Sequence, residues 1–276
     1  MSEKQYNPIG VFDSGYGGLT ILKEIVKELP QYDFLYLGDN ARAPYGSRSF
    51  EEVYELTLEC VKQLFDKGCH LVVLACNTAS AKALRNIQQK DLPNIDPSRR
   101  VLGVIRPTTE LAGSYSKTKH IGVLGTTGTV LSQSYPIEVS KFSPEIKVYQ
   151  EACPLWVPLV ENGKYNSDEA DTEIKTHIDN LMSRSPKIDT IILGCTHYPL
   201  LINKIKKFVP ENVALIMQGD IVAKSLKDYL KRHPEMDAKC TKNNTIEFFT
   251  TGDANNFDTH AGKFYGREIK SKHLKL

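Results

Sequence analysis

The chain has 276 residues, of which 41% are hydrophobic and 25% are charged, and its formal net charge is +2. These values are ordinary for a folded globular protein, so they exclude a disordered chain, and the charge is too small to indicate a nucleic-acid partner. The length allows one large domain or two ordinary ones, each with its own core.

Strand-like and helix-like segments alternate along the chain. Short apolar runs predict strands at residues 9–12, 33–37, 71–75, 101–105, 120–124, 147–149, 190–194, 213–217 and 245–250. Apolar residues at helical spacing predict helices at residues 19–29, 50–65, 78–89, 108–115, 170–182, 199–208 and 221–230. Residues 91–100, with Pro93 and Pro97, indicate a linker. The alternation predicts an α/β fold with mainly parallel sheets.

The start of the chain, its apolar runs and its cysteines indicate the cellular compartment in which we expect the protein. The polar start leads directly into the first expected strand, which is not the pattern of a signal peptide, and no apolar run approaches the roughly 20 residues of a membrane span. The six cysteines include no C-x-x-C pair, which is typical of free thiols in a reducing compartment. We therefore expect a cytoplasmic protein with neither membrane nor nucleic-acid partners. Five basic residues are expected to form a solvated C-terminal segment: Lys263, Arg267, Lys270, Lys272 and Lys275.

Two stretches share one pattern. Residues 71–80 read L-V-V-L-A-C-N-T-A-S, and residues 190–199 read T-I-I-L-G-C-T-H-Y-P. Each is an apolar run typical of a buried parallel strand, followed by a cysteine and by polar side chains that open a helix. Because residues just past the carboxyl ends of parallel strands form the ligand crevice, we expect Cys76 and Cys195 to face one small ligand from opposite sides. A duplicated half-protein explains the repetition.

The position of these two cysteines favours acid–base chemistry. The other four cysteines are interpreted as packing residues: Cys60, Cys69, Cys153 and Cys240. Cys76 and Cys195 each lie at the amino end of an expected helix, where the helix dipole and free amides stabilise a thiolate. Inverting a carbon stereocentre requires a base on one face and an acid on the other. A matched pair of thiols fits that reaction without a metal or an organic cofactor.

Metal and phosphate chemistry fit the same residues less well. Cys76, Cys195 and His197 could supply three zinc ligands, but zinc sites usually include a local C-x-x-C or H-x-x-x-H pair, which is missing. A phosphatase nucleophile would require an arginine six residues beyond the cysteine. Those positions are Lys82 and Leu201.

A dinucleotide-binding loop is a further alternative. Gly15 and Gly17 follow a strand, and Asp39 lies at about the distance that the fingerprint places its acidic residue. The third glycine position, however, is Thr20, and Asp13 would place a carboxylate beside the pyrophosphate. The match is therefore partial.

Six motifs, in the same order, resemble those of glutamate racemase in the aspartate/glutamate racemase superfamily. They are D-S-G-x-G-G-L-T at 13–20, P-Y-G at 44–46, A-C-N-T-A at 75–79, G-T-T-G-T at 125–129, A-C-P-L-x-V-P-L-V-E at 152–161 and G-C-T-H-Y-P-L-L at 194–201. The likeness runs from residue 9 to at least residue 252. It implies a cofactor-independent interconversion of L- and D-glutamate that supplies D-glutamate for peptidoglycan, and it implies a homodimer.

The resemblance also implies an architecture. It predicts two pseudo-symmetric, doubly wound α/β domains with the active site in the cleft between them. The first domain would comprise residues 1–98 and 213–276, and the second would comprise residues 99–212.

Residue roles follow from the same resemblance. Cys76 and Cys195 would be the proton-transfer residues, with Asp13 assisting Cys76 and with His197 and Glu151 assisting Cys195. The resemblance implies these substrate contacts: Asp13, Ser14, Pro44, Tyr45, Gly46, Asn77, Thr78, Thr126, Thr129, Thr196 and His197. Hydroxyls and helix-terminal amides suit carboxylates, although some of these hydroxyls could instead cap helices.

Two positions depart from the family pattern. Arg106-Pro107-Thr108 stands where a Glu-Pro-Gly-like turn is expected, and Tyr16 replaces a small aliphatic residue in the glycine loop. Two other functions remain open: a racemase acting on aspartate or another amino acid, and a non-catalytic protein that binds acidic metabolites. The second of these leaves the matched cysteine unexplained.

Overall fold

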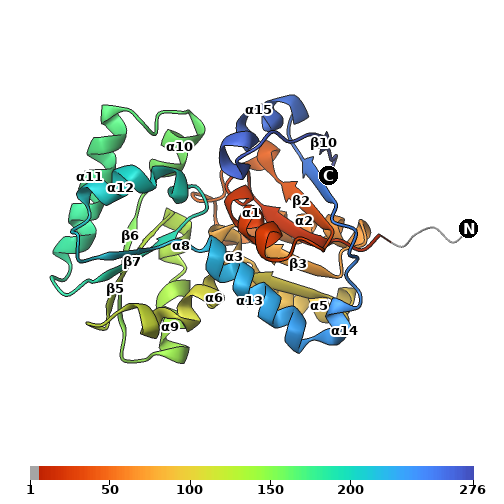
Figure 1. The fold of residues 1–276 in the computed structure, drawn as a ribbon, viewed down its shortest axis with the longest axis horizontal. Helices are drawn as coiled ribbons and strands as arrows, with labels where there is room; N and C mark the ends of the chain where they lie inside the picture. The colour runs from red at the N-terminus through yellow and green to blue at the C-terminus, as the bar shows by residue number, and fades with distance from the viewer. Residues whose placement is uncertain (1–5) are drawn as a thin grey trace, which may run out of the picture.

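Residues 6–276, which this computed structural model describes, form two sheets of parallel strands (Figure 1). The strands are β1 (Ile9–Asp13), β2 (Phe34–Gly38), β3 (Leu71–Leu74), β4 (Arg100–Gly103), β5 (His120–Gly125), β6 (Lys147–Ala152), β7 (Thr190–Gly194), β8 (Ala214–Ile216), β9 (Ile246–Thr250) and β10 (Ser271–His273). One sheet has the order β10-β9-β2-β1-β3-β4, and the other has the order β6-β5-β7-β8. We call the halves built on them the first and second domains. The predicted α/β fold class is confirmed.

The helices connect successive strands. The longer ones are α1 (Leu19–Glu28), α2 (Phe50–Asp66), α9 (Ser134–Phe142), α11 (Asp168–Ser183), α13 (Gly219–Arg232) and α15 (Ala254–Tyr265). The shorter ones are η1 (Asn40–Arg42), α3 (Asn77–Lys82), α4 (Leu84–Asn86), η2 (Ile87–Asp91), α5 (Leu92–Ile95), α6 (Ile105–Glu110), α7 (Ala112–Tyr115), α8 (Thr127–Leu131), α10 (Trp156–Glu161), η3 (Tyr198–Leu201), α12 (Ile202–Phe208) and α14 (Pro234–Asp237). Among residues 6–276, none of these helices has the length and apolar character needed to span a bilayer.

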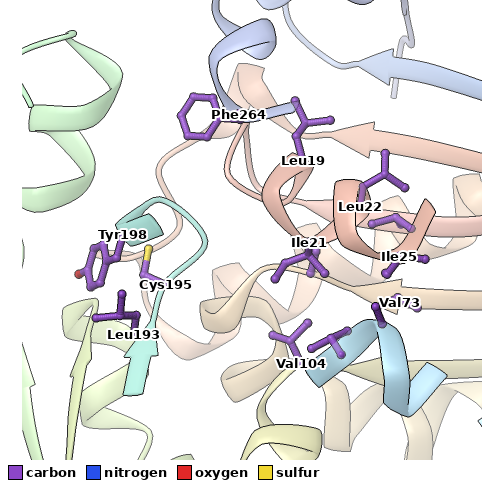
Figure 2. Packing of buried hydrophobic residues seen from close by; sticks show 14 of the residues in the cluster. Leu19, Ile21, Leu22, Ile25, Val73, Val104, Leu193, Cys195, Tyr198 and Phe264 are labelled. Carbon is purple, nitrogen blue, oxygen red and sulfur yellow. The ribbon is translucent and has the colours of Figure 1, made fainter. Parts of the chain in front are cut away.

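The central strand of the first domain is buried on both faces. Ile9 and Val11 of β1 belong to the same apolar cluster as Leu22 of α1, and Figure 2 shows part of this cluster. Phe12, which points to the opposite face, belongs to a separate cluster with Val61 of α2. Helices on both faces explain why the strand is apolar at successive positions instead of alternating with polar residues.

Each of the two sheets contains four strands in the same arrangement. The order β2-β1-β3-β4 in the first sheet matches β6-β5-β7-β8 in the second, and every pairing in both is parallel. The two strands that precede the matched cysteines, β3 and β7, therefore occupy equivalent places. This equivalence agrees with the expected duplication, and β9 and β10 extend only the first sheet.

The predicted domain boundaries are wrong by one strand at each crossing. β4 pairs with β3 and stays in the first sheet, whereas the prediction placed it in the second domain. β8 pairs with β7 in the second sheet, whereas the prediction returned it to the first. The predicted linker at 91–100 instead includes α5, where Pro93 occupies the first helical turn and its missing N–H costs no hydrogen bond.

The C-terminal segment is more ordered than expected. Its five basic side chains are exposed, as predicted for a solvated segment. Its backbone nevertheless forms β10, which pairs with β9 and adds an edge strand to the first sheet. Exposed lysines on such an edge hinder pairing with another chain.

Asp33 fixes the loop that leads into β9, and we predict that Asp33→Asn lowers the free energy of unfolding by about 2 kcal/mol at pH 7. The buried carboxylate accepts hydrogen bonds from the backbone amides of Asn243 and Thr245, at 3.1 and 2.9 Å, and from both side chains. Burial opposes its ionisation, but these bonds and one from Thr241 lower the pKa of Asp33 to about 2.

The pH dependence provides the check on this prediction. The folded-state pKa of Asp33 lies below its ordinary value of 3.8, so its contribution is present above that value and is lost as the pH falls toward 2. Urea unfolding at pH 6 and at pH 3 should therefore show a smaller difference between the wild type and the variant at pH 3. A difference that stays the same at both values would contradict this account.

Candidate active site

The carboxyl ends of the strands from both domains meet at a small cavity. Its volume is about 160 Å³, which is below the roughly 300–1,000 Å³ of sites for drug-sized ligands and suits a small metabolite. Of the residues predicted from sequence, these line it: Ser14, Pro44, Tyr45, Gly46, Cys76, Asn77, Thr78, Thr126, Cys195, Thr196 and His197. Asp13, Thr129 and Glu151 do not line it.

Cys76 enters the cavity from the first domain. It follows β3 and caps α3, and its sulfur accepts a hydrogen bond from the Ala79 backbone amide at 3.4 Å. The Ser14 hydroxyl lies 3.6 Å from the same sulfur. Burial, together with the charge of nearby Asp13, raises the pKa of Cys76 to about 12. Burial at this position therefore favours the neutral thiol of Cys76 near neutral pH.

Cys195 enters the same cavity from the second domain. It follows β7, and its sulfur lies 4.0 Å from Nδ1 of His197. Only 6% of each cysteine is exposed to solvent. Figure 2 shows Cys195 at the end of its strand, beside Tyr198 and Leu193. The two cysteines thus occupy equivalent strand ends but have different neighbours.

His197 places a positive charge beside the Cys195 sulfur. Its Nε2 lies 3.0 Å from a carboxylate oxygen of Glu161, the last residue of α10. Burial opposes protonation of the ring, but the interactions with Cys195 and Glu161 outweigh it and raise the pKa of His197 to about 10. The imidazole is consequently protonated near neutral pH, where it can pair with a thiolate.

Glu151 was expected to assist Cys195 together with His197, but its carboxylate binds other residues. The Glu151 carboxylate lies 2.9 Å from Nδ1 of His177 and 2.7 Å from the Arg184 guanidinium, so it is bound to α11 and its C-terminal end. The carboxylate that contacts His197 is instead that of Glu161. Glu151 immediately precedes the A-C-P-L-x-V-P-L-V-E motif and Glu161 is its last residue, and the decisive difference is that Glu161 ends a helix that faces the cavity.

Asp13 lies just beneath the cavity. One carboxylate oxygen accepts a hydrogen bond from the Gly15 amide at 2.9 Å, and the other accepts one from the Thr196 hydroxyl at 3.4 Å. Burial raises the pKa of Asp13, and the charge of His197 partly counteracts the rise. Asp13 therefore joins the glycine loop of the first domain to Thr196 in the second domain.

Hydroxyl groups bridge the domains on the other side of the cavity. Thr78 and Thr126, from opposite domains, have their Oγ1 atoms 2.9 Å apart. Thr129, predicted as a substrate contact, is fully buried, and its hydroxyl accepts a hydrogen bond from the Thr126 hydroxyl at 3.1 Å, so it supports Thr126 rather than lining the cavity. The Gly46 carbonyl accepts a hydrogen bond from the Gly128 amide at 2.8 Å, which adds a second bridge.

Two other predicted substrate contacts have side chains that form hydrogen bonds with other protein groups. The Tyr45 hydroxyl donates to Asp39. The Asn77 side chain bonds Gln218 and Tyr135 at 2.8 and 2.9 Å. These residues line the cavity, but their polar side-chain groups bind other protein atoms and leave the backbone to meet a ligand.

The glycine loop packs closely against the second domain. A Cβ atom on Gly17 would lie 2.2 Å from Oγ1 of Thr196 and 2.5 Å from Nδ1 of His197, so only glycine fits. The acidic residue of the dinucleotide alternative, Asp39, is bound by Arg42, Tyr45 and Thr251.

We predict that Gly17→Ala lowers kcat about 100-fold, because the new methyl group must displace His197 from Cys195. Gly125→Ala is the matched control, since its Cβ would meet Thr129 at an ordinary 3.5 Å. Racemisation followed by circular dichroism measures both variants. Wild-type kcat in Gly17→Ala would show that the close approach of the two domains is unimportant.

The two departures from the family pattern lie outside the cavity. Tyr16 stacks on Phe257 and Phe264 of α15, with ring centroids 5.3 and 5.8 Å apart, and Phe264 meets the His197 ring edge-on at 5.2 Å. Figure 2 places Phe264 on the α15 side of the junction between the domains. Arg106 is exposed and pairs with Glu110 of the same helix at 2.8 Å. Tyr16 thus contributes to an aromatic layer that covers His197.

Chemical alternatives can be compared with this geometry. Among residues 6–276, no three His, Cys, Asp or Glu side chains are grouped so that they could hold a metal ion. The arrangement instead offers two thiols, one imidazolium and several hydroxyls around a space the size of an amino acid.

Comparisons with known proteins show the family to which the chain belongs. The family model for Asp/Glu/Hydantoin racemase matches residues 9–226. The glutamate racemase of Ruegeria sp. (strain TM1040) is 41% identical over 95% of this chain and 97% of its own length. A glutamate racemase isoform of Bacillus anthracis has a similar structure, with a TM-score of 0.89 and 36% identity over 99% of this chain and 98% of its own.

The glutamate racemase of Francisella tularensis subsp. tularensis SCHU S4, solved in complex with D-glutamate, is also similar. Its TM-score is 0.86 and its identity is 30%, over 98% of both chains. The matches to these proteins extend over nearly the whole chain and include both cysteine-bearing strand ends. The chain therefore belongs to the Asp/Glu/Hydantoin racemase family, together with the glutamate racemases that it resembles.

Proposed function

We propose that this racemase interconverts L- and D-glutamate by moving a proton at Cα between Cys76 and Cys195, without a cofactor. One observation carries the proposal: both thiols line the same small cavity, and they reach it from equivalent strand ends of two opposed domains. Such a pair can address both faces of one carbon atom. A single-thiol mechanism would leave the second cysteine without a role.

In the proposed reaction, one proton is removed from Cα and one proton is added to it. The thiolate of one cysteine takes the Cα proton, and the electron pair of the broken C–H bond moves into the adjacent carboxylate. The thiol of the other cysteine then gives its proton to the opposite face of Cα and becomes a thiolate. The two cysteines have exchanged states, so the enzyme is ready for the reverse direction.

The unequal surroundings of the cysteines support the required starting state. We infer that Cys195 starts as the thiolate, paired with the His197 imidazolium, while Cys76 starts as the neutral thiol. Glu161 holds the imidazolium in place. Burial and the nearby Asp13 raise the pKa of Cys76, which keeps the second proton available for transfer.

Polar groups around the cavity are suited to the charges of glutamate. We propose that the hydroxyls of Ser14, Thr78, Thr126 and Thr196 bind the carboxylates, together with backbone amides at the start of α3. We further propose that Pro44, Tyr45 and Gly46 form one wall through backbone atoms.

We infer that the biological role is to supply D-glutamate for peptidoglycan in the cytoplasm, and that the enzyme acts as a homodimer. The similarity to glutamate racemases supports this inference. Rescue of a bacterial strain that requires D-glutamate tests the role, and light scattering during gel filtration tests the dimer.

The activity itself is tested by incubating pure, reduced protein with L-glutamate and following circular dichroism with no cofactor added. Loss of the signal toward zero, with deuterium entering Cα in deuterated water, is the expected result. Aspartate and other amino acids in the same assay test the alternative substrates. Glutamate binding without exchange of the Cα hydrogen would favour the non-catalytic binding protein instead.

A further inference from the structure

Gln218 lies where the chain passes between the domains. It follows β8 of the second domain and immediately precedes α13 of the first. Its side-chain amide donates to the Val104 carbonyl at 3.1 Å, and Val104 lies directly after β4, where the chain leaves the first sheet for the second domain. Figure 1 shows α3, α6 and α13 where the two domains meet. Gln218 therefore ties the two connecting segments to each other.

The Gln218 side chain also completes a closed ring of three hydrogen bonds. The Asn77 amide donates to Oε1 of Gln218 at 2.8 Å, Nε2 of Gln218 donates to the Tyr135 hydroxyl at 3.0 Å, and that hydroxyl donates to Oδ1 of Asn77 at 2.9 Å. Thr108 lies 3.2 Å from the same Nε2. All of these side chains are buried, and only 3% of Gln218 is exposed.

The ring touches the supports of both cysteines. Asn77 is the residue after Cys76 and the first residue of α3. On the other side, a Cβ atom on Gly194 would lie 3.1 Å from the Tyr135 hydroxyl, and Gly194 immediately precedes Cys195. One ring of buried hydrogen bonds thus lies against the base of each cysteine, one in each domain.

We propose that Gln218 is a positioning residue that holds Cys76 and Cys195 at their working separation by closing the Asn77–Gln218–Tyr135 ring between the domains. The inference rests on the proposed two-cysteine reaction and adds a residue that does not line the cavity. A buried amide with all of its partners fixes one arrangement, because any shift of one domain would leave polar groups unpaired.

The test compares Gln218→Met, which keeps the length of the side chain but removes its hydrogen bonds, with Tyr135→Phe, which removes only the hydroxyl. We expect each variant to lower kcat about 10-fold. Because both changes open the same ring, the double variant should lose much less than the 100-fold expected of independent sites. Gln88→Met is the matched control. It removes the hydrogen bond from the Gln88 side-chain amide to the Val101 carbonyl, within the first domain, and should keep wild-type kcat.

Isotope effects separate positioning from simple loss of stability. With glutamate deuterated at Cα, the isotope effect on kcat should rise in both ring variants, because misplaced sulfurs make proton transfer slower relative to the other steps. A less stable but correctly arranged enzyme would lose kcat only in proportion to its folded fraction, with the isotope effect and KM unchanged. That outcome would overturn the inference. Wild-type kcat in Gln218→Met would also overturn it, as would a loss of kcat in the double variant equal to the product of the two single losses. An inactive wild type would instead refute the proposed function.

Discussion

Replacing either Cys76 or Cys195 by serine is expected to lower racemisation about 1,000-fold, which lies within the range for losing a general acid or base. The geometry supplies one thiol from each domain, so neither can stand in for the other. A serine hydroxyl keeps the shape of the side chain but ionises far less readily than a thiol, whose ordinary pKa is about 8.5. Circular dichroism with L- and D-glutamate measures the loss in both directions.

The same two variants should differ in what they still exchange. In deuterated water the remaining cysteine can remove the Cα proton from the face that it meets and return a deuteron to that face. Each variant should therefore exchange the Cα hydrogen of one enantiomer only, and the two variants should favour opposite enantiomers. Cys240→Ser is the control, because this buried cysteine donates only to the Met236 carbonyl. Racemisation by either active-site variant at the wild-type rate would contradict the two-thiol mechanism.

Glu161→Gln is expected to lower kcat about 10-fold near neutral pH and to move the alkaline limb of the pH profile down by at least about one unit. In the wild type, the interactions with Cys195 and Glu161 keep the pKa of His197 at about 10, so the imidazolium persists until the pH approaches that value. Without the Glu161 charge the pKa of His197 falls, and the positive charge beside Cys195 is lost at lower pH.

Glu151→Gln is the control for this experiment, and it also tests the role first predicted for that residue. The Glu151 carboxylate binds His177 and Arg184, so its loss should leave the alkaline limb in place. Rate profiles from pH 6 to pH 10.5 measure both variants. A shift in Glu151→Gln with none in Glu161→Gln would contradict the arrangement described above.

The parts of the fold that were predictable from sequence have strong local signals. The strands β3 and β7 are continuous apolar runs followed by a cysteine and a polar cluster, and both lie at the cavity as expected. The edge strands β4 and β8 could not be assigned to a sheet. Their residues form strands in either sheet equally well, and only long-range pairing with β3 and β7 decides their place.

The site shows the same division between local and long-range information. Motifs predicted that Cys76, Cys195 and His197 lie at the cavity, because all three are within three residues of the end of a buried strand. The choice between Glu151 and Glu161 depended on which carboxylate turns toward His197, and that direction follows from packing rather than from spacing. Gln218 belongs to none of the motifs, since its importance comes from partners far along the chain at positions 77 and 135.

A structure of the protein with bound glutamate is the most direct test of the central claim. It should place Cα between the two sulfurs, with each sulfur about 3–3.5 Å from it on opposite faces, which is the separation at which a reacting group can transfer a proton. If both sulfurs lie on the same face, or if one remains out of reach of Cα, proton transfer between Cys76 and Cys195 cannot invert the stereocentre.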